Sequence, residues 1–249
     1  MLRISFFLIC VLFITGCTTA RVQNKERASK LNAELGLAYL MKGNNEQALI
    51  KLNKAIKLNS DNEKAYLYVA ELYRRLDENE RADDYFNRAL DANSSDSAVN
   101  NNYGAFLCAN KKYDEAFKHF KVALENPVYP ERSNVFENIG ICSQVQGNIK
   151  VARENYIKAI KANPNSAKSL LAVAQLDFDS ENIKSASKYF GYYKRVAKHT
   201  AESLWLGILI ANKKQDAKTK ASLSWSLERK FPKSKETKLL KKLRASGAL

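Results

Sequence analysis

Apolar residues recur along most of this chain with the spacing of helices. Ala48, Leu52 and Ala55 stand at i, i+4 and i+7, which places them on one face of a helix. Only 9 Gly and 4 Pro interrupt the 249 residues, so few positions break a helix. The pattern predicts an all-α protein.

The helical pattern itself repeats about every 34 residues. The set at Ala48 returns as Ala82, Phe86 and Ala89, as Ala116, Phe120 and Ala123, as Ala152, Tyr156 and Ala159, and as Ala186 and Phe190. Two residues are inserted around positions 127–130, before the fourth copy. A small residue also recurs in the first helix of each copy: Gly36, Ala70, Gly104, Gly140 and Ala174. These small residues predict that the two helices of a copy approach closely.

This period and spacing resemble the tetratricopeptide repeat. The resemblance implies a right-handed superhelical solenoid of about six helix pairs over residues 30–232, with one concave face. Residues 200–232 form the sixth, degenerate copy. Residues 233–249 are predicted to form a basic capping helix, because the open end of a solenoid exposes core.

The N-terminal segment is predicted to be a targeting signal rather than part of the fold. One Arg precedes an apolar run from Ile4 to Ile14, which is too short for a membrane-spanning helix of about 20 residues. The run ends in Thr15-Gly16-Cys17 and resembles a bacterial lipobox. The resemblance implies a signal peptide at 1–16, lipidation of Cys17 with palmitate among the acyl groups, and a lipidated tether at 17–29. The alternative is an ordinary signal peptide with a chance cysteine.

In lipoproteins of this type, a residue other than Asp at position 18 implies that the protein is carried to the outer membrane. The protein would then be lipid-anchored on the periplasmic face.

The net charge of +15 is unevenly distributed. Residues 183–249 carry 17 Lys and Arg against 4 Asp and Glu, whereas residues 1–182 are nearly balanced. Such a surplus first suggests nucleic acid or an anionic membrane as partner. We expect no nucleic acid for a secreted protein, which leaves a solvated cap or an attachment to anionic surfaces.

Sequence motifs of catalysis are absent, so we expect no enzyme, no cofactor, no metal site and no small-molecule substrate. The two histidines, His119 and His199, lie far apart in the sequence. Cys108 and Cys142 fall on adjacent first helices and could form a disulfide. Two buried thiols acting as small apolar side chains are the alternative.

The first helices of the repeats are expected to line a protein-binding groove. Its predicted residues are Leu37, Leu40, Met41, Leu67, Tyr68, Asn101, Asn102 and Asn138. The apolar members suit an amphipathic helix or an extended apolar peptide, and each Asn can both donate to and accept from a peptide backbone. If the repeat register is shifted by one residue, the apolar members are core instead. In chaperone-binding repeats, a lysine at one groove position binds the terminal carboxylate of the partner. No lysine occupies that position in this chain.

The whole layout is similar to the type IV pilus biogenesis and stability lipoproteins, or pilotins. The segment from Asn101 to Cys108 is the best local match, and Gly140-Ile141-Cys142 also resembles the family. Members of the family have paired cysteines, so the resemblance leaves both a disulfide and two free thiols open. The resemblance implies an outer-membrane lipoprotein that binds secretin subunits and assists their localisation and multimerisation. An adaptor for peptidoglycan hydrolases or outer-membrane protein assembly is the alternative. A third alternative is a cytosolic RNA-binding repeat protein, which requires that the N-terminal segment is not a signal peptide.

Overall fold

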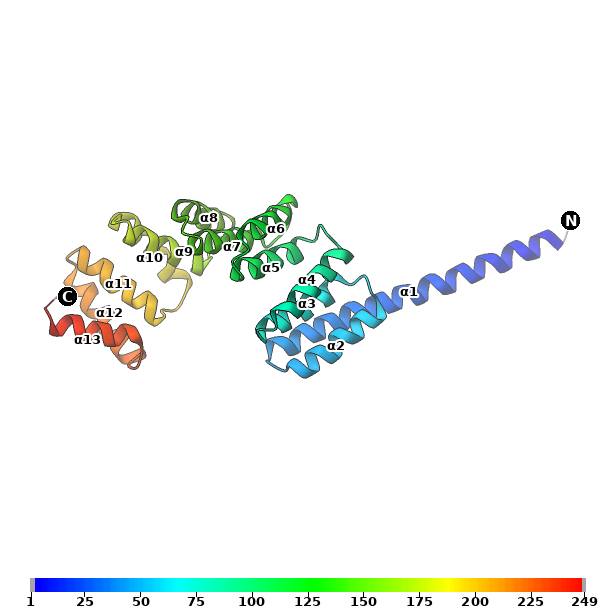
Figure 1. Cartoon of the computed structure of the whole chain (residues 1–249), viewed down its shortest axis with the longest axis horizontal. Helices are drawn as coiled ribbons and strands as arrows, with labels where there is room; N and C mark the ends of the chain where they lie inside the picture. Colours follow the sequence, from blue (N-terminus) through cyan, green and yellow to red (C-terminus); the bar gives the residue numbers. More distant parts are fainter. Residues whose placement is uncertain (1–2, 248–249) are drawn as a thin grey trace. The chain divides into compact units, whose positions relative to one another are not determined.

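The computed structural model describes the backbone of residues 3–247 and the side chains of residues 22–247. This part of the chain contains thirteen helices and no strand (Figure 1). The helices are α1 (Arg3–Met41), α2 (Asn45–Leu58), α3 (Glu63–Arg75), α4 (Asn79–Ala92), α5 (Ser97–Ala109), α6 (Tyr113–Glu125), α7 (Arg132–Val145), α8 (Ile149–Ala162), α9 (Ala167–Asp179), α10 (Ile183–Val196), α11 (Ala201–Lys213), α12 (Ala217–Lys230) and α13 (Lys235–Ala245). The predicted all-α fold of helix pairs is confirmed.

The helices form two compact units, Met1–Pro127 and Val128–Leu249, called unit 1 and unit 2 below. Unit 1 contains three helix pairs, α1 to α6, and unit 2 contains three further pairs, α7 to α12, followed by α13. The boundary falls at the inserted residues between the third and fourth repeats. The sixth pair is α11 and α12, and the final helix α13 follows it.

Side-chain caps fix where many of the helices begin. Asn44, Asn62 and Asn182 each accept a hydrogen bond from the backbone N–H three residues later. Asp96 and Asp216 do the same for α5 and α12. A capped helix start satisfies a backbone donor that has no partner within the helix. The polar residues between apolar runs therefore define the helix starts.

Each helix pair turns through one residue with positive φ. The residues are Gly43, Asp77, Lys111, Gly147, Glu181 and Gln215. Glycine adopts this conformation without strain, whereas other residues are disfavoured there. The turn geometry is thus the same in all six pairs, although only two have the residue best suited to it.

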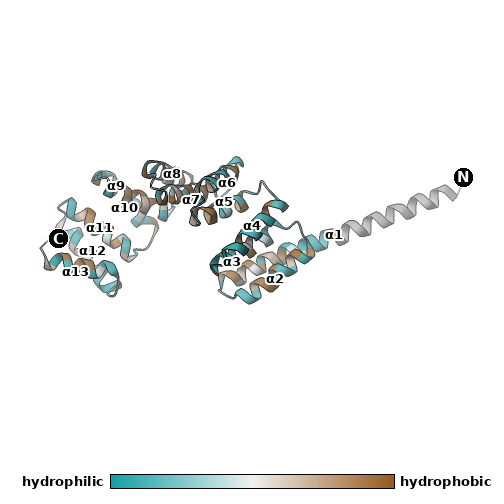
Figure 2. Ribbon diagram, in the orientation of Figure 1, coloured by the Kyte–Doolittle hydropathy of each residue, from teal (hydrophilic) through white to brown (hydrophobic). Residues whose placement is uncertain are grey.

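Small residues allow the paired helices to pack closely, as predicted. A Cβ added to Gly104 would lie 2.7 Å from a ring carbon of Phe120, and one added to Gly140 would lie 2.7 Å from the ring of Tyr156. Phe120 is fully buried and Tyr156 is nearly so. The aromatic side chain of each second helix therefore fills the space that the glycine of the first helix leaves. In Figure 2 hydrophobic and hydrophilic segments alternate along the ribbons of α2 to α13.

The prediction of a tether at 17–29 needs correction at its C-terminal end. Residues 18–29 belong to α1, and they contain no Gly or Pro. Ser29 is fully buried, and its hydroxyl donates to Ala55 O at 2.8 Å. The folded domain therefore begins before residue 30, because this side chain joins the first helix pair.

The predictions for residues 1–16 and for lipidation of Cys17 concern side chains outside the described residues. No helix within the described residues is long and apolar enough to cross a membrane.

Candidate binding surfaces

The first helices of unit 1 line a hollow of about 300 Å³. Ala33 on α1 and Tyr68 on α3 form part of its wall, and Tyr68 is a predicted groove residue. Its charged residues are Glu26, Lys30, Glu34, Asp61, Glu63 and Lys64. Four carboxylates and two ammonium groups lie there, so the hollow suits a polar segment carrying both signs of charge.

Hydrogen bonds hold the base of this hollow in place. Asn62 Nδ2 donates to Ser29 Oγ at 2.8 Å, while Asn62 Oδ1 caps α3. Lys30 Nζ lies 2.7 Å from Glu26 Oε1, and this hydrogen bond raises the pKa of Lys30. These hydrogen bonds order Asn62, Lys30 and Glu26, three of the lining residues.

Further along the α3 face, Glu71 lies between two arginines. Arg74 Nη2 and Arg75 Nε are 2.6 and 3.0 Å from Glu71 Oε1. Burial would raise the pKa of Glu71, but the hydrogen bonds from both arginines outweigh it and lower the pKa. Arg75 also donates to Leu40 O at 3.2 Å. The hydrogen bonds from both arginines therefore keep the carboxylate ionised.

The first helices of unit 2 line a second hollow, of about 280 Å³. Its apolar lining residues are Ile141, Leu171 and Ala172. Its polar lining residues are Glu137, Gln144, Tyr156, Lys168, Gln175 and Glu202. An apolar floor with amide and carboxylate groups around it suits an extended peptide, whose side chains need apolar contact and whose backbone needs donors and acceptors.

The polar groups of the second hollow are held by one another. Glu137 Oε2 accepts hydrogen bonds from Ser166 Oγ at 2.8 Å and Ser169 Oγ at 2.9 Å. The Tyr156 hydroxyl donates to Gln144 Oε1 at 2.9 Å. Burial, and then the charge of Glu137, raises the pKa of Tyr156 to about 12, so this hydroxyl stays protonated. The preorganised arrangement lowers the ordering cost of binding a segment there.

Three predicted groove residues are not available to a partner. Leu40 and Leu67 are 1% and 4% exposed, and Asn101 is 5% exposed. We correct their assignment as groove residues, because Leu40 and Leu67 pack in the core. The register alternative raised from the sequence therefore applies to these two leucines.

The other predicted groove residues retain exposed surface. Met41 is exposed, and Leu37, Tyr68, Asn102 and Asn138 are half-buried. Asn102 Nδ2 donates to Ala98 O at 2.8 Å, which leaves its second N–H and its carbonyl oxygen as the groups that a partner can use. Binding by these residues stays a prediction.

Sequence reasoning did not single out the apolar floor of unit 2. Ile141 and Leu171 occupy the same first-helix positions as Leu37 and Leu67, so the positional rule could have found them. The prediction instead selected apolar residues of the first two repeats, and two of these, Leu40 and Leu67, are buried.

Cys108 and Cys142 are both buried and both disulfide-bonded. Their mutual pairing stays a prediction, which non-reducing electrophoresis tests.

Neither histidine is placed to bind a metal. His119 Nδ1 lies 2.8 Å from Asn100 Oδ1, and His199 Nδ1 lies 3.1 Å from Ser203 Oγ. Among the described residues, no group of three or more His, Cys, Asp or Glu side chains could hold a metal ion. Both histidines are partners of neighbouring polar side chains.

Comparison with known proteins identifies the repeat. The tetratricopeptide repeat model matches residues 33–97 and 69–130. The chain is 32% identical over 241 residues to the type IV pilus assembly protein PilF of Pseudomonas aeruginosa, covering 94% of this chain and 96% of PilF. It is also 33% identical over 120 residues to an uncharacterised Haemophilus influenzae protein, covering 48% of this chain and 67% of that protein.

Two solved structures extend this similarity to the fold. The structure of Pseudomonas aeruginosa PilF has a TM-score of 0.81 at 32% identity, covering 88% of this chain and 98% of that one. PilW, described as a widely conserved type IV pilus biogenesis factor, has a TM-score of 0.76 at 30% identity, covering 85% and 97%. The similarity therefore includes both units.

Proposed function

Because this chain belongs to the family of the type IV pilus assembly protein PilF, we propose that it is a non-catalytic scaffold of type IV pilus biogenesis. The observation that carries the proposal is the 32% identity to PilF over 94% of the chain. Similarity confined to a few repeats would indicate only the fold, whereas this similarity includes all six helix pairs. Tetratricopeptide repeats act by binding other proteins, and both hollows suit a peptide partner.

The partner in this proposal is the secretin subunit. A lipid-anchored scaffold holds secretin subunits near the outer membrane and assists their localisation and multimerisation. The first-helix hollow of unit 2, with Ile141 and Leu171 on its floor, takes an apolar segment of the subunit. Covering such a segment prevents the uncontrolled pairing of exposed strand edges, and the anchor raises its effective concentration at the membrane.

The anchor in this proposal is Cys17. The sequence Ile14-Thr15-Gly16-Cys17 supports it, and several acyl chains would make the attachment effectively permanent. Labelled palmitate should be incorporated into the wild-type protein and not into Cys17→Ser. Equal labelling of both proteins, or none in either, would reject the lipid anchor while leaving the scaffold role open.

Deletion of the gene tests the scaffold role. We expect fewer secretin multimers in the outer membrane and fewer surface pili, and we expect crosslinked secretin to co-purify with the wild-type protein. Normal multimer abundance together with no secretin contact would contradict the proposal. Crosslinking to a peptidoglycan hydrolase or an outer-membrane assembly factor instead would favour the adaptor function.

A matched pair of variants tests the hollow. Ile141 lines it and is 41% exposed, while Ile149 is 47% exposed on α8 and lies outside the lining. Ile141→Arg should reduce secretin capture at least ten-fold, because a buried unpaired charge at an interface costs several kcal/mol. Ile149→Arg should leave capture unchanged. Charge at Leu67 is not a useful test, because that side chain is buried and its replacement would unfold the protein.

A further inference from the structure

The last two helices of unit 2 present an outer face that the secretin proposal does not use. On α12 the exposed residues Lys218, Trp225 and Arg229 stand at i, i+7 and i+11, which puts them on one side of the helix. Trp225 is 58% exposed, although tryptophan seldom stands so open on a folded protein. The Arg229 guanidinium carbon lies 4.9 Å from the centre of the Trp225 ring.

The neighbouring helix α13 has a similar exposed stripe. Lys235, Lys238, Leu239 and Lys242 stand at i, i+3, i+4 and i+7, and all four are exposed. The opposite side of α13 buries Leu240 against the core of unit 2, so α13 is amphipathic and firmly seated. Its exposed side is almost entirely cationic.

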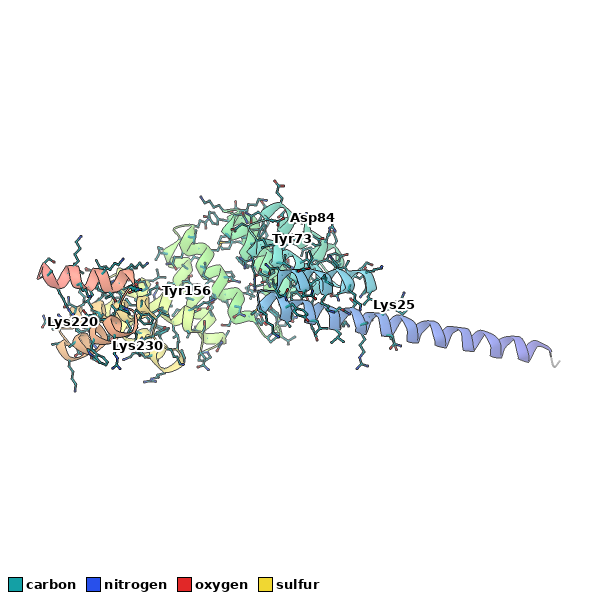
Figure 3. All side chains as sticks on the ribbon, turned by 90° about the horizontal axis from the view of Figure 1, so that it is seen from below. Lys25, Tyr73, Asp84, Tyr156, Lys220 and Lys230 are labelled. Carbon is teal, nitrogen blue, oxygen red and sulfur yellow. The ribbon has the colours of Figure 1, made fainter. Side chains whose placement is uncertain are left out.

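An ion pair joins the two helices. Arg244 Nη1 on α13 lies 2.9 Å from Glu228 Oε1 on α12, three residues after Trp225. The two helices lie side by side (Figure 1). We call the exposed residues of both stripes the basic end: Lys218, Trp225, Arg229, Lys235, Lys238, Leu239 and Lys242. Figure 3 labels Lys220 and Lys230, which also belong to α12 but are not part of the basic end.

The few acidic residues of this region do not neutralise the basic end. Asp216 caps α12, Glu228 pairs with Arg244, and Glu236, which is 7% exposed, lies 3.7 Å from Lys235 Nζ. Glu202, the fourth, lines the hollow of unit 2.

Of the four lysines of the basic end, Lys235 pairs with Glu236, and Lys218 interacts electrostatically with Asp216. Within the described part of the chain, Lys218, Lys238 and Lys242 form no ion pair. A solvated cap needs cations, but it does not need the exposed apolar side chains of Trp225 and Leu239 among them.

We infer that the basic end binds the anionic headgroups of a lipid bilayer. Lysine and arginine gain from the surface potential of anionic lipids, and tryptophan is favoured at the level of the headgroups. Leu239 adds apolar contact between Lys238 and Lys242. An acidic protein segment would satisfy the cations and leave Trp225 and Leu239 uncovered, so a bilayer fits the mixture better. The inference does not depend on secretin binding.

Trp225 provides a reporter that is specific to this surface. The chain contains two tryptophans, and Trp205 packs against the core cluster of α11, α12 and α13. The full chain with Trp205→Phe therefore has Trp225 as its single tryptophan. Its emission and its quenching by acrylamide report the basic end alone, even when the N-terminus is itself attached to the vesicle.

The experiment compares vesicles of phosphatidylcholine with vesicles containing phosphatidylglycerol at low ionic strength. We expect a blue shift and a loss of acrylamide quenching on the anionic vesicles only, both reversed by salt. In Lys235→Gln/Lys238→Gln/Lys242→Gln, the ratio of docked to undocked protein should fall roughly 100-fold, because each lysine near an anionic surface contributes about five-fold. The triple variant Lys42→Gln/Lys54→Gln/Lys57→Gln, which removes exposed lysines of unit 1, should behave like the parent.

Several outcomes would overturn the inference. Trp225 that stays fully quenchable on anionic vesicles would show that the basic end does not meet the bilayer. Equal shifts in both triple variants would show that charge at α13 is irrelevant. A shift produced by soluble polyglutamate and not by vesicles would identify an acidic protein as the partner.

Discussion

Single small residues set the spacing of each helix pair in this protein. Gly104 lies directly against the buried ring of Phe120, whereas Gly191 in α10 would meet no atom within 4 Å if it carried a Cβ. Both residues lie inside helices and neither has a positive φ. The two glycines therefore separate the effect of packing from that of helix propensity.

We expect opposite effects on stability from alanine at these two positions. Gly104→Ala should lower the free energy of unfolding by about 1–3 kcal/mol, because the added methyl overpacks a closed core. Gly191→Ala should raise it by about 0.5–1 kcal/mol, because alanine is the better helix former. Urea unfolding followed by circular dichroism measures both. Stabilisation by Gly104→Ala would mean that Phe120 moves aside at little cost.

A buried carboxylate links three consecutive helices of unit 2. Asp177 on α9 is 1% exposed. It accepts hydrogen bonds from the guanidinium of Arg153 on α8 and from the hydroxyl of Ser185 on α10. Because α8 and α9 belong to successive repeats, the contact with Arg153 joins one helix pair to the next. The contact with Ser185 joins α9 to α10 within a pair.

Removal of this carboxylate should destabilise unit 2. Asp177→Ala should lower the free energy of unfolding by about 2–3 kcal/mol, since Arg153 is 39% exposed and can turn to water. Arg153→Met should cost at least as much, because it leaves a buried carboxylate unpaired.

The control is a pair on the surface of α4. Asp84 and Arg88 are 3.0 Å apart and about half exposed, and Asp84→Ala should cost less than about 1 kcal/mol. Equal losses for Asp177→Ala and Asp84→Ala in thermal unfolding would show that the buried cluster adds no stability.

The arrangement of the helices could be predicted from the sequence more fully than the binding surface. The pairing of Gly104 with Phe120 and of Gly140 with Tyr156 depends on residues within one repeat, so the 34-residue period reveals it. The exposure of a groove residue depends on neighbouring repeats. Leu67 and Tyr68 are adjacent in sequence, yet Leu67 is buried and Tyr68 lines a hollow. The position of Asp177 likewise predicts nothing until Arg153 and Ser185 are brought beside it.

At the scale of the whole molecule, the protein has a single histidine in each unit, and both are partly buried. Burial lowers the pKa of His119, against an opposing effect of Glu115. Burial also lowers the pKa of His199, and the positive charges of Lys194 and Lys230 lower it further. Each folded unit therefore disfavours the protonated imidazole relative to the unfolded chain.

This shift gives the pH dependence of stability a definite sign. Where the folded pKa is below the ordinary value of about 6.5, the unfolded chain binds more protons, so stability rises with pH. The contribution of each histidine is complete above its ordinary pKa and is lost as the pH falls through that value towards the folded pKa. The melting temperature should therefore fall between about pH 8 and about pH 5.

His119→Gln/His199→Gln should start from a lower melting temperature, because it loses ring contacts, and should show a flatter profile. The single variants should each remove part of the slope, since one histidine lies in each unit and the two are distant in sequence. Parallel profiles for wild type and the double variant would assign the pH dependence to carboxylates instead.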